Sequence, residues 1–388
     1  MKEIIEKICE RTYNNALRFD GKIPANSTDA YGKFKLGGGG WTDGFFVGML
    51  YLAYAYTRDE KFLKCADAYQ PYFEKRAENA PEWCEENNIL PLDHDTGFIF
   101  KLSQVYRYKL NGDEKARALA IRAADILAAR YNPKGRFIRA WDTWKWDTDP
   151  EFIEAKKGKM IIDSMMNIAL LFFASEETGD PKYRDIAAAH ADTIAKYIIR
   201  PDGSTFHQFD FDPGSGEPKR GVTGQGYADD SCWSRGQAWA IYGFCETYEH
   251  TKCEKYLDFS EKTAKYFISH LMPTGLPLWD FACEELPLRP YDASAAAVAL
   301  SGLISLDKYR KNVLYEDAIA RLYSGLIKHC SALDIDGWES VLLHSCIGSA
   351  YRKGNEHTIV VPYVDCPIIY ADYYFLEALM KITDTFKL

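Results

Sequence analysis

Two aspartates, Asp95 and Asp163, are the carboxylates best placed for acid–base chemistry. Each stands at the start of a long apolar run, and Asp163 lies between Met-Ile-Ile and SMMNIALLFF. An aspartic acid in an apolar wall has a raised pKa because burial disfavours the charged form, and a raised pKa suits a proton donor. The alternative is that each is a helix N-cap, a role worth about 1 kcal/mol. The residues alone leave both interpretations open.

The stretch from Tyr227 to Tyr242 places two tryptophans and one arginine at the mouth of an apolar helix. These are Trp233, Arg235 and Trp239. Indole faces can cover the C–H side of a sugar ring, and a guanidinium fork matches a carboxylate. The pattern is therefore typical of a site for an acidic sugar. The competing interpretation is a buried tryptophan pair beside a structural ion pair.

Three further loops carry residues suited to sugar binding. Trp41 follows four glycines, which allow the backbone to approach a ligand closely. The alternative interpretation is that this stretch is only a flexible loop. His207 lies in an alternating aromatic stretch that predicts a hairpin arm, and a lone histidine is more often structural. Trp141, Trp144 and Trp146 crowd another loop, where we expect one or more of them to be a sugar platform.

Composition excludes several classes of protein. The 388 residues are 47% hydrophobic and carry a net charge of −9 without a basic cluster, so nucleic acid and anionic membranes are poor partners. No stretch reaches the length of a membrane span, and the N-terminus lacks a signal-peptide core. Ten cysteines show no CxxC spacing and eight histidines show no HExxH. We predict reduced thiols, a cytoplasmic location, no metal and no cofactor.

Apolar runs of helical period recur six times along the chain, 52 to 80 residues apart. They begin at Asp43, Asp95, Asp163, Ser234, Asp292 and Asp372. Each is apolar nearly all round, and amphipathic segments lie between them. The alternation predicts an all-α closed ring of six helical hairpins, forming one domain over residues 1–388.

The loops that enter the inner helices should carry the function. Parallel inner helices start at the same end of the ring, where each N-terminus carries roughly +0.5 of a charge. An acidic protein can therefore still attract an anion there. The loops concerned are residues 37–43, 83–95, 137–163, 203–234 and 274–292.

Several long motifs, in order, resemble the unsaturated glucuronyl hydrolases of glycoside hydrolase family 88. They are HDTGF (94–98), IIDSMMN (161–167), STFHQFDFDP (204–213), GQGYADDSCWSRGQAWAIYGF (224–244), PLWDF (277–281) and YADYYFLEAL (370–379). The resemblance covers nearly the whole chain. It implies an (α/α)6 barrel that hydrolyses the oligosaccharides left by polysaccharide lyases, here disaccharides of glycosaminoglycans ending in a C4=C5 unsaturated uronic acid.

The resemblance also implies roles for single residues. Asp95 and Asp163 match the two catalytic carboxylates of the family. The family positions that line the sugar site are matched here by Trp41, His207, Gln225, Arg235 and Trp239, and we expect Trp141 and Trp233 to lie beside them. The C4=C5 bond beside the ring oxygen is an enol ether, so we expect Asp163 to protonate C4 and then accept a proton from water, while Asp95 holds ring hydroxyls. Arg235 would bind the uronate carboxylate or, equally, orient Gln225 or an aspartate.

The chain departs from the family pattern in three places. Gly224 replaces a histidine found in some members, and YDASA (291–295) replaces RDSSA. The loop at 342–358 aligns poorly; its candidate sulfate ligands, which could equally form a solvated loop, are Ser345, Ser349, Tyr351, Arg352 and Lys353. An unsaturated rhamnogalacturonyl hydrolase and a non-catalytic carbohydrate-binding barrel are the alternative functions, and a homo-oligomer is compatible with the sequence.

Overall fold

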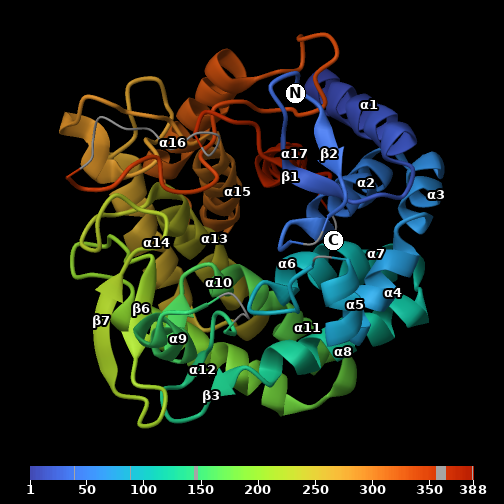
Figure 1. The fold of residues 1–388 in the computed structure, drawn as a ribbon. Coiled ribbons are helices and arrows are strands. Elements are labelled where there is room, and N and C mark those ends of the chain that lie inside the picture. The colour runs from blue at the N-terminus through green and yellow to red at the C-terminus, as the bar shows by residue number, and fades with distance from the viewer. Residues whose placement is uncertain (39, 88, 144–146, 355–363, 387) are drawn as a thin grey trace.

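The computed structural model describes residues 1–388 apart from 39, 88, 144–146, 355–363 and 387. Two layers of helices form a ring (Figure 1). Within the described part of the chain the inner layer has six members. They are α2 (Asp43–Thr57), α6 (Thr96–Phe100) continued by the π-helix η1 (Lys101–Val105) and α7 (Tyr106–Asn111), α10 (Ser164–Asn167) with α11 (Ala169–Thr178), α13 (Ser234–Thr251), α15 (Ala293–Tyr309) and α17 (Ile369–Ile382).

The outer layer alternates with the inner one along the chain. Its members are α1 (Lys2–Phe19), α3 (Lys61–Asp67) with α4 (Gln70–Glu78), α8 (Glu114–Ala128), α12 (Pro181–Tyr197), α14 (Glu254–Ser269) and α16 (Val313–Gly325) with η3 (Leu326–Cys330). Each inner helix packs on the next, from α2 through α6, α10, α13 and α15 to α17, and α17 packs on α2. The predicted closed ring of six hairpins is confirmed. The single domain over residues 1–388 stays a prediction, which the contacts of α1 with both α2 and α17 support.

Burial explains why the two layers differ in sequence. In α15 every residue from Ala293 to Leu303 is buried, whereas the amphipathic α14 buries one face only. Glycines allow the inner helices to approach one another. A Cβ atom on Gly44 would lie 2.4 Å from a backbone oxygen of α6, and one on Gly97 would lie 2.4 Å from the backbone of Asn167.

Long loops enter the inner helices at one end of the ring, and short turns leave them at the other. Two of the short turns end in a helix cap, since Asp113 and Asp180 accept backbone N–H groups of α8 and α12. The long loops contain the small elements β1 (Pro24–Thr28), β2 (Phe34–Leu36), α5 (Pro81–Glu86), β3 (Tyr131–Asn132), β4 (Phe137–Ile138), α9 (Pro150–Lys157), β5 (Lys159–Ile161), β6 (Gln208–Phe211), β7 (Pro218–Val222) and η2 (Phe281–Glu285).

The predicted hairpin arm and the predicted start of the last inner helix have different outcomes. The hairpin arm after His207 is confirmed, because β6 pairs antiparallel with β7 and also with β5. The predicted start of the last inner helix at Asp372 is wrong. That helix begins at Ile369, and the Asp372 carboxylate instead accepts the backbone N–H groups of Val341 and Leu342.

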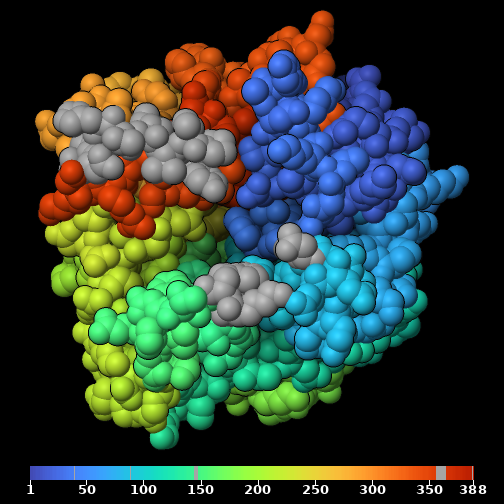
Figure 2. Space-filling view, viewed as in Figure 1, coloured from blue at the N-terminus to red at the C-terminus, as the bar shows by residue number. Residues whose placement is uncertain are grey.

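The face that carries the long loops is hollowed near its centre, as Figure 2 shows. None of the helices among the described residues combines the length and apolarity needed to cross a bilayer.

Candidate active site

Asp163 directly precedes α10 and does not cap it. Its side chain accepts none of the helix's backbone N–H groups, so the N-cap interpretation is wrong for its carboxyl group. The residue is 8% exposed, and its Oδ2 atom has no hydrogen-bond partner. Burial raises the pKa of Asp163 to about 7, against the opposing charge of Arg235. Near neutral pH this carboxyl group therefore holds a proton about half of the time.

Asp95 stands at the start of α6 and likewise leaves that helix uncapped. The amide nitrogen of Asn167 lies 3.4 Å from Asp95 Oδ1 and 3.2 Å from the backbone oxygen of Asp163. Burial, followed by the charges of Asp93 and Asp163, raises the pKa of Asp95 well above its ordinary value. The structure thus brings the two predicted carboxylates together around one asparagine.

His207 faces Asp163 with a defined tautomer. Its Nδ1 atom accepts the backbone N–H groups of Gly224 at 2.9 Å and Gln225 at 3.0 Å, so in the neutral ring the proton is on Nε2. That Nε2 atom lies 3.8 Å from Asp163 Oδ2. Burial, and then the charge of Arg235, lowers the pKa of His207 well below its ordinary value, which keeps the ring neutral. His207 therefore offers one N–H donor to the Asp163 side chain.

The two tryptophans of the Tyr227–Tyr242 stretch are buried. Trp233 is 2% exposed and packs between the His207 ring, at 4.4 Å, and the guanidinium of Arg235, also at 4.4 Å. Trp239 is fully buried against Phe98, and its indole N–H favours the charged form of Asp163. Both side chains build the wall of the site. Direct stacking of either one on a sugar stays a prediction.

Arg235 is 1% exposed and already has a full set of partners at its two terminal nitrogens. Nη1 donates to Asp292 Oδ2 at 2.8 Å, Ser294 Oγ at 3.1 Å and Cys346 O at 2.6 Å, and Nη2 donates to Gln225 Oε1 at 2.7 Å and Ile347 O at 3.0 Å. Of the two predicted roles, this geometry favours orienting Gln225 over receiving a substrate carboxylate. Since arginine can only donate, it fixes the amide oxygen of Gln225 and leaves the NH2 group free to donate to a ligand.

Trp41 and Trp141 line a pocket of about 370 Å³ beside Asp95. Both are partly exposed, as a sugar platform must be. Trp41 is supported from behind by Phe98 and Tyr370, and Trp141 meets the His94 ring edge-on at 5.5 Å. The other two tryptophans predicted for that loop, Trp144 and Trp146, lie outside the described residues.

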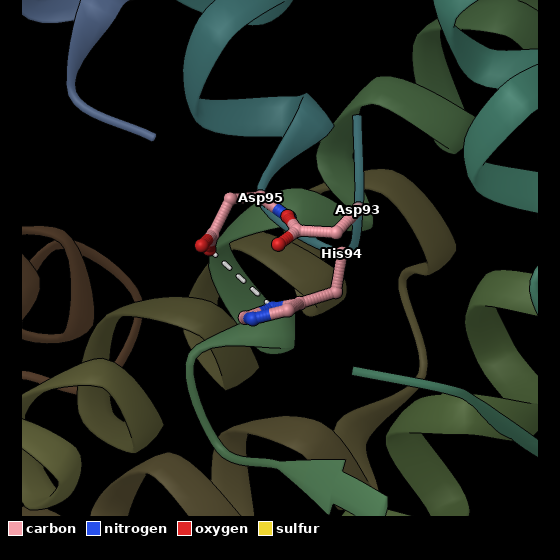
Figure 3. A group of neighbouring side chains, drawn as sticks. All are labelled: Asp93, His94 and Asp95. Atoms are coloured by element: carbon pink, nitrogen blue, oxygen red, sulfur yellow. Dashed lines mark hydrogen bonds and ion pairs between the residues drawn. The ribbon is translucent and has the colours of Figure 1, made fainter. Parts of the chain in front are cut away.

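Asp93, His94 and Asp95 form the one cluster of possible metal ligands found in the described part of the chain (Figure 3). One ligand atom from each lies within 4.8 Å of the others. These atoms already have partners, because Asp93 Oδ1 accepts the backbone N–H of Asp95 at 2.9 Å and His94 Nδ1 lies 3.4 Å from Asp95 Oδ1. The prediction that the protein uses no metal stays a prediction.

Sequence reasoning did not assign three residues of this site. His94 and Asn167 lie within the motifs that identified the two aspartates, and Asp93 lies just before them. Their place in these motifs is the sequence signal that could have identified His94 and Asn167 as site residues. The contribution of Asp93 to the pKa of Asp95 depends on the fold of the loop.

Most of the candidate sulfate ligands of the 342–358 loop are buried or already bonded to other parts of the protein. Arg352 donates to the carbonyl groups of Gly226 at 2.9 Å and Gly224 at 2.6 Å. Ser349 lies 3.3 Å from the Gly224 carbonyl, whereas Ser345 is fully buried. Tyr351 is also buried, Lys353 is exposed, and residues 355–358 lie outside the described residues. The loop supports the backbone on either side of Gln225, and sulfate binding there stays a prediction.

Comparison with known proteins agrees with this geometry. The unsaturated chondroitin disaccharide hydrolase of Streptococcus pneumoniae is 38% identical over 88% of this chain and 81% of its own length. The unsaturated glucuronyl hydrolase of Bacillus sp. (strain GL1) is 34% identical over 96% of this chain and 93% of its own length. The crystal structure of the unsaturated glucuronyl hydrolase from Streptococcus agalactiae matches with a TM-score of 0.86 and 35% identity, covering 100% of this chain and 92% of that one.

The sequence profile of Glycosyl Hydrolase Family 88 matches residues 4–374, nearly the whole chain. Together with the ring of six hairpins and the paired aspartates at its open end, this match shows that the chain belongs to glycosyl hydrolase family 88.

Proposed function

We propose that this protein hydrolyses glycosaminoglycan oligosaccharides that end in a C4=C5 unsaturated uronic acid. The relatives named above support this substrate class. A variant of the S. agalactiae enzyme has been crystallised in complex with dGlcA-GalNAc6S. The observation that carries the proposal is the Asp163 carboxyl group, which is buried, has a pKa of about 7 and faces the His207 N–H.

The reaction needs a group that can give a proton and then take one back. Protonation of C4 draws the electron pair of the double bond into the new C–H bond, and positive charge develops at C5 and the ring oxygen. Water then adds at C5, and the resulting hemiketal opens to a ketone and releases the next sugar. A carboxyl group with a pKa near neutrality suits both steps, because proton donation and return have similar driving forces.

The neighbours of Asp163 stabilise its charge after proton donation. The Nε2–H of His207 points toward Oδ2 and the indole N–H of Trp239 favours the same ionised carboxylate. The 3.8 Å separation from His207 is longer than a hydrogen bond, and we expect it to shorten when substrate is bound. These donors lower the barrier because they act on charge that forms only during the reaction.

Gln225 and Asp95 would position the sugar. The NH2 group of Gln225, oriented by Arg235, suits the uronate carboxylate, and the Asp95 carboxyl can hold ring hydroxyls. We therefore assign recognition of the substrate carboxylate to Gln225, with Arg235 behind it.

The test is a reaction in deuterium oxide with an unsaturated chondroitin disaccharide. We expect loss of the ultraviolet absorbance of the enol ether and one deuteron on C4 of the product. Unchanged absorbance with chondroitin, hyaluronan and heparin-derived disaccharides would reject the proposal. A pectin-derived unsaturated rhamnogalacturonyl disaccharide tests the alternative activity, and binding without turnover would indicate a non-catalytic barrel.

The state of the cysteines bears on the cellular location of the enzyme. All ten cysteines are free, which supports the cytoplasm as its location. Rates with unsulfated, 4-sulfated and 6-sulfated disaccharides measure the sulfation preference, and the mass in solution tests the homo-oligomer.

A further inference from the structure

The backbone beside His207 is held from outside by an arginine. Arg352 donates from Nη2 to the carbonyl oxygen of Gly224 at 2.6 Å and from Nη1 to that of Gly226 at 2.9 Å. The hydroxyl of Ser349 adds a third donor, 3.3 Å from the Gly224 oxygen. A planar guanidinium fork can hold two acceptors in a fixed geometry. None of the steps of the proposed reaction involves Arg352.

The Gly224 carbonyl group belongs to a peptide unit that also contacts His207. A trans peptide unit is planar, so its C=O and N–H groups point in opposite directions. The unit that carries the Gly224 oxygen also carries the N–H of Gln225, and this N–H donates to His207 Nδ1 at 3.0 Å. Arg352 on one side of the unit therefore fixes the direction of the N–H on the other side.

The peptide unit needs such a restraint because it adjoins a glycine. A Cβ atom on Gly224 would lie 2.3 Å from the amide nitrogen of the buried Gln208 and 3.2 Å from Cε1 of His207, so there is no room for a side chain. Glycine has more accessible backbone conformations than other residues, and the unit beside it can rotate more easily. Rotation would turn the carbonyl oxygen toward His207 in place of the N–H of Gln225.

The orientation of this unit bears on which nitrogen of His207 carries the proton. An N–H donor at Nδ1 leaves the proton on Nε2, which lies 3.8 Å from Asp163 Oδ2. A carbonyl oxygen in the same place would accept a hydrogen bond from Nδ1–H, and a neutral ring would then have no proton on Nε2. The donor that faces Asp163 would be lost. Rotation would also break the bond from Arg352 to the Gly224 oxygen.

We propose that Arg352 is a positioning residue for the reaction. By holding the Gly224 carbonyl oxygen away from the imidazole ring, it keeps the N–H of Gln225 on Nδ1. This keeps the Nε2 proton of His207 facing Asp163. The contribution of Arg352 to turnover rests on the proposed function, whereas its effect on the histidine ring does not require turnover.

The first experiment determines the His207 tautomer without substrate. The ring nitrogens are observed by NMR at neutral pH in protein labelled with nitrogen-isotope histidine, and the His207 signals are those missing in His207→Asn. We expect a proton on Nε2 alone in the wild type and a mixture of both tautomers in Arg352→Met. Arg352→Lys, with an intermediate mixture, serves should Arg352→Met fail to fold. A tautomer that is the same in the wild type and the variants would overturn the proposal.

The second experiment measures turnover of an unsulfated unsaturated disaccharide. We expect Arg352→Met to lower kcat about tenfold, because the Nε2 donor is present only part of the time, and Arg352→Lys to recover part of the rate. Arg289→Met is the matched control, since Arg289 is also exposed and donates to a backbone carbonyl, that of Glu284 at 3.4 Å. This control should leave kcat unchanged. A loss confined to sulfated substrates would make Arg352 a sulfate ligand and overturn the proposal.

A double substitution shows whether Arg352 acts through His207. His207→Asn already lacks the Nε2 donor, so adding Arg352→Met should lower kcat by less than about twofold more. A further loss of about tenfold in the double variant would place the role of Arg352 elsewhere and overturn the proposal. If the wild type consumes no unsaturated disaccharide, the proposed function fails, and the tautomer measurement alone decides whether Arg352 positions His207.

Discussion

The Nε2 atom of His207 lies 3.8 Å from the Oδ2 atom of Asp163, and both atoms are buried without a hydrogen-bond partner. The backbone of Gly224 and Gln225 fixes the proton on that nitrogen. An imidazole held in this way cannot easily take a second proton, since burial keeps its pKa low. It acts as a donor to Asp163 and not as a base.

Two substitutions of His207 test this relationship. His207→Asn keeps an acceptor near Nδ1 but removes the Nε2 donor, and we expect kcat to fall about 100-fold. His207→Gln restores a donor near Nε2 and should recover part of the rate. The pH above which the activity of His207→Asn falls should also rise, because the Asp163 carboxylate loses a stabilising N–H. Equal rates for the two variants, beside an unaffected His250→Gln control, would contradict this role.

The pH dependence of activity follows from the pKa of Asp163. Because the proton donor must be protonated, kcat/KM should be constant at moderately acidic pH and fall tenfold per unit above a pH of about 7. Initial rates measured from about pH 5 to about pH 9 give this profile. A rate that rises through pH 8 would show that the reaction needs a base there.

The same pKa predicts a pH-dependent stability. The folded protein holds the Asp163 proton more tightly than the unfolded chain does, so folding is favoured at low pH and loses free energy as pH rises from about 4 to about 7. Three pKa units at about 1.4 kcal/mol each make this loss about 4 kcal/mol. Asp163→Asn should therefore be more stable than the wild type at pH 8 and similar at pH 4. Urea unfolding at both pH values measures this, and a variant less stable at pH 8 would contradict the burial of an ionisable carboxyl.

Gln225→Glu tests which group recognises the uronate. The new carboxylate can still pair with Arg235, but it presents no N–H to the substrate. We expect KM to rise about 10- to 100-fold for the natural substrate, since a hydrogen bond to a charged group is lost. The methyl ester of the same disaccharide, which has no carboxylate charge, should be affected much less. An equal loss for acid and ester would place carboxylate recognition elsewhere.

The inner helices and their burial could be predicted from the sequence, because these helices are apolar on all sides. The start of the last helix was misplaced by three residues, since Asp372 looks like a cap but binds the backbone of a loop 30 residues earlier. Its pKa is also raised to about 7 by burial, yet both its oxygens accept backbone N–H groups. A raised pKa therefore marks a reactive carboxyl only where an oxygen is free, as in Asp163.

The partners of Arg235 could not be derived from local sequence. They come from Gln225, from the start of α15 and from the backbone of residues 346 and 347. The motif shows that an arginine stands beside two tryptophans. Only the fold shows that the terminal nitrogens of this arginine already donate to acceptors within the protein. Arg76, which lines the pocket beside Asp95 from an outer helix, likewise lies in none of the motifs.

Turnover of an unsaturated glucuronyl disaccharide by Asp163→Asn, compared with the wild type, tests the central claim most directly. The asparagine keeps the shape of the side chain but has no proton to give to C4. We predict that substrate still binds with a similar dissociation constant, and that loss of the enol-ether absorbance slows by at least about 1000-fold. If the folded variant consumes the disaccharide at a rate close to that of the wild type, Asp163 is not the proton donor.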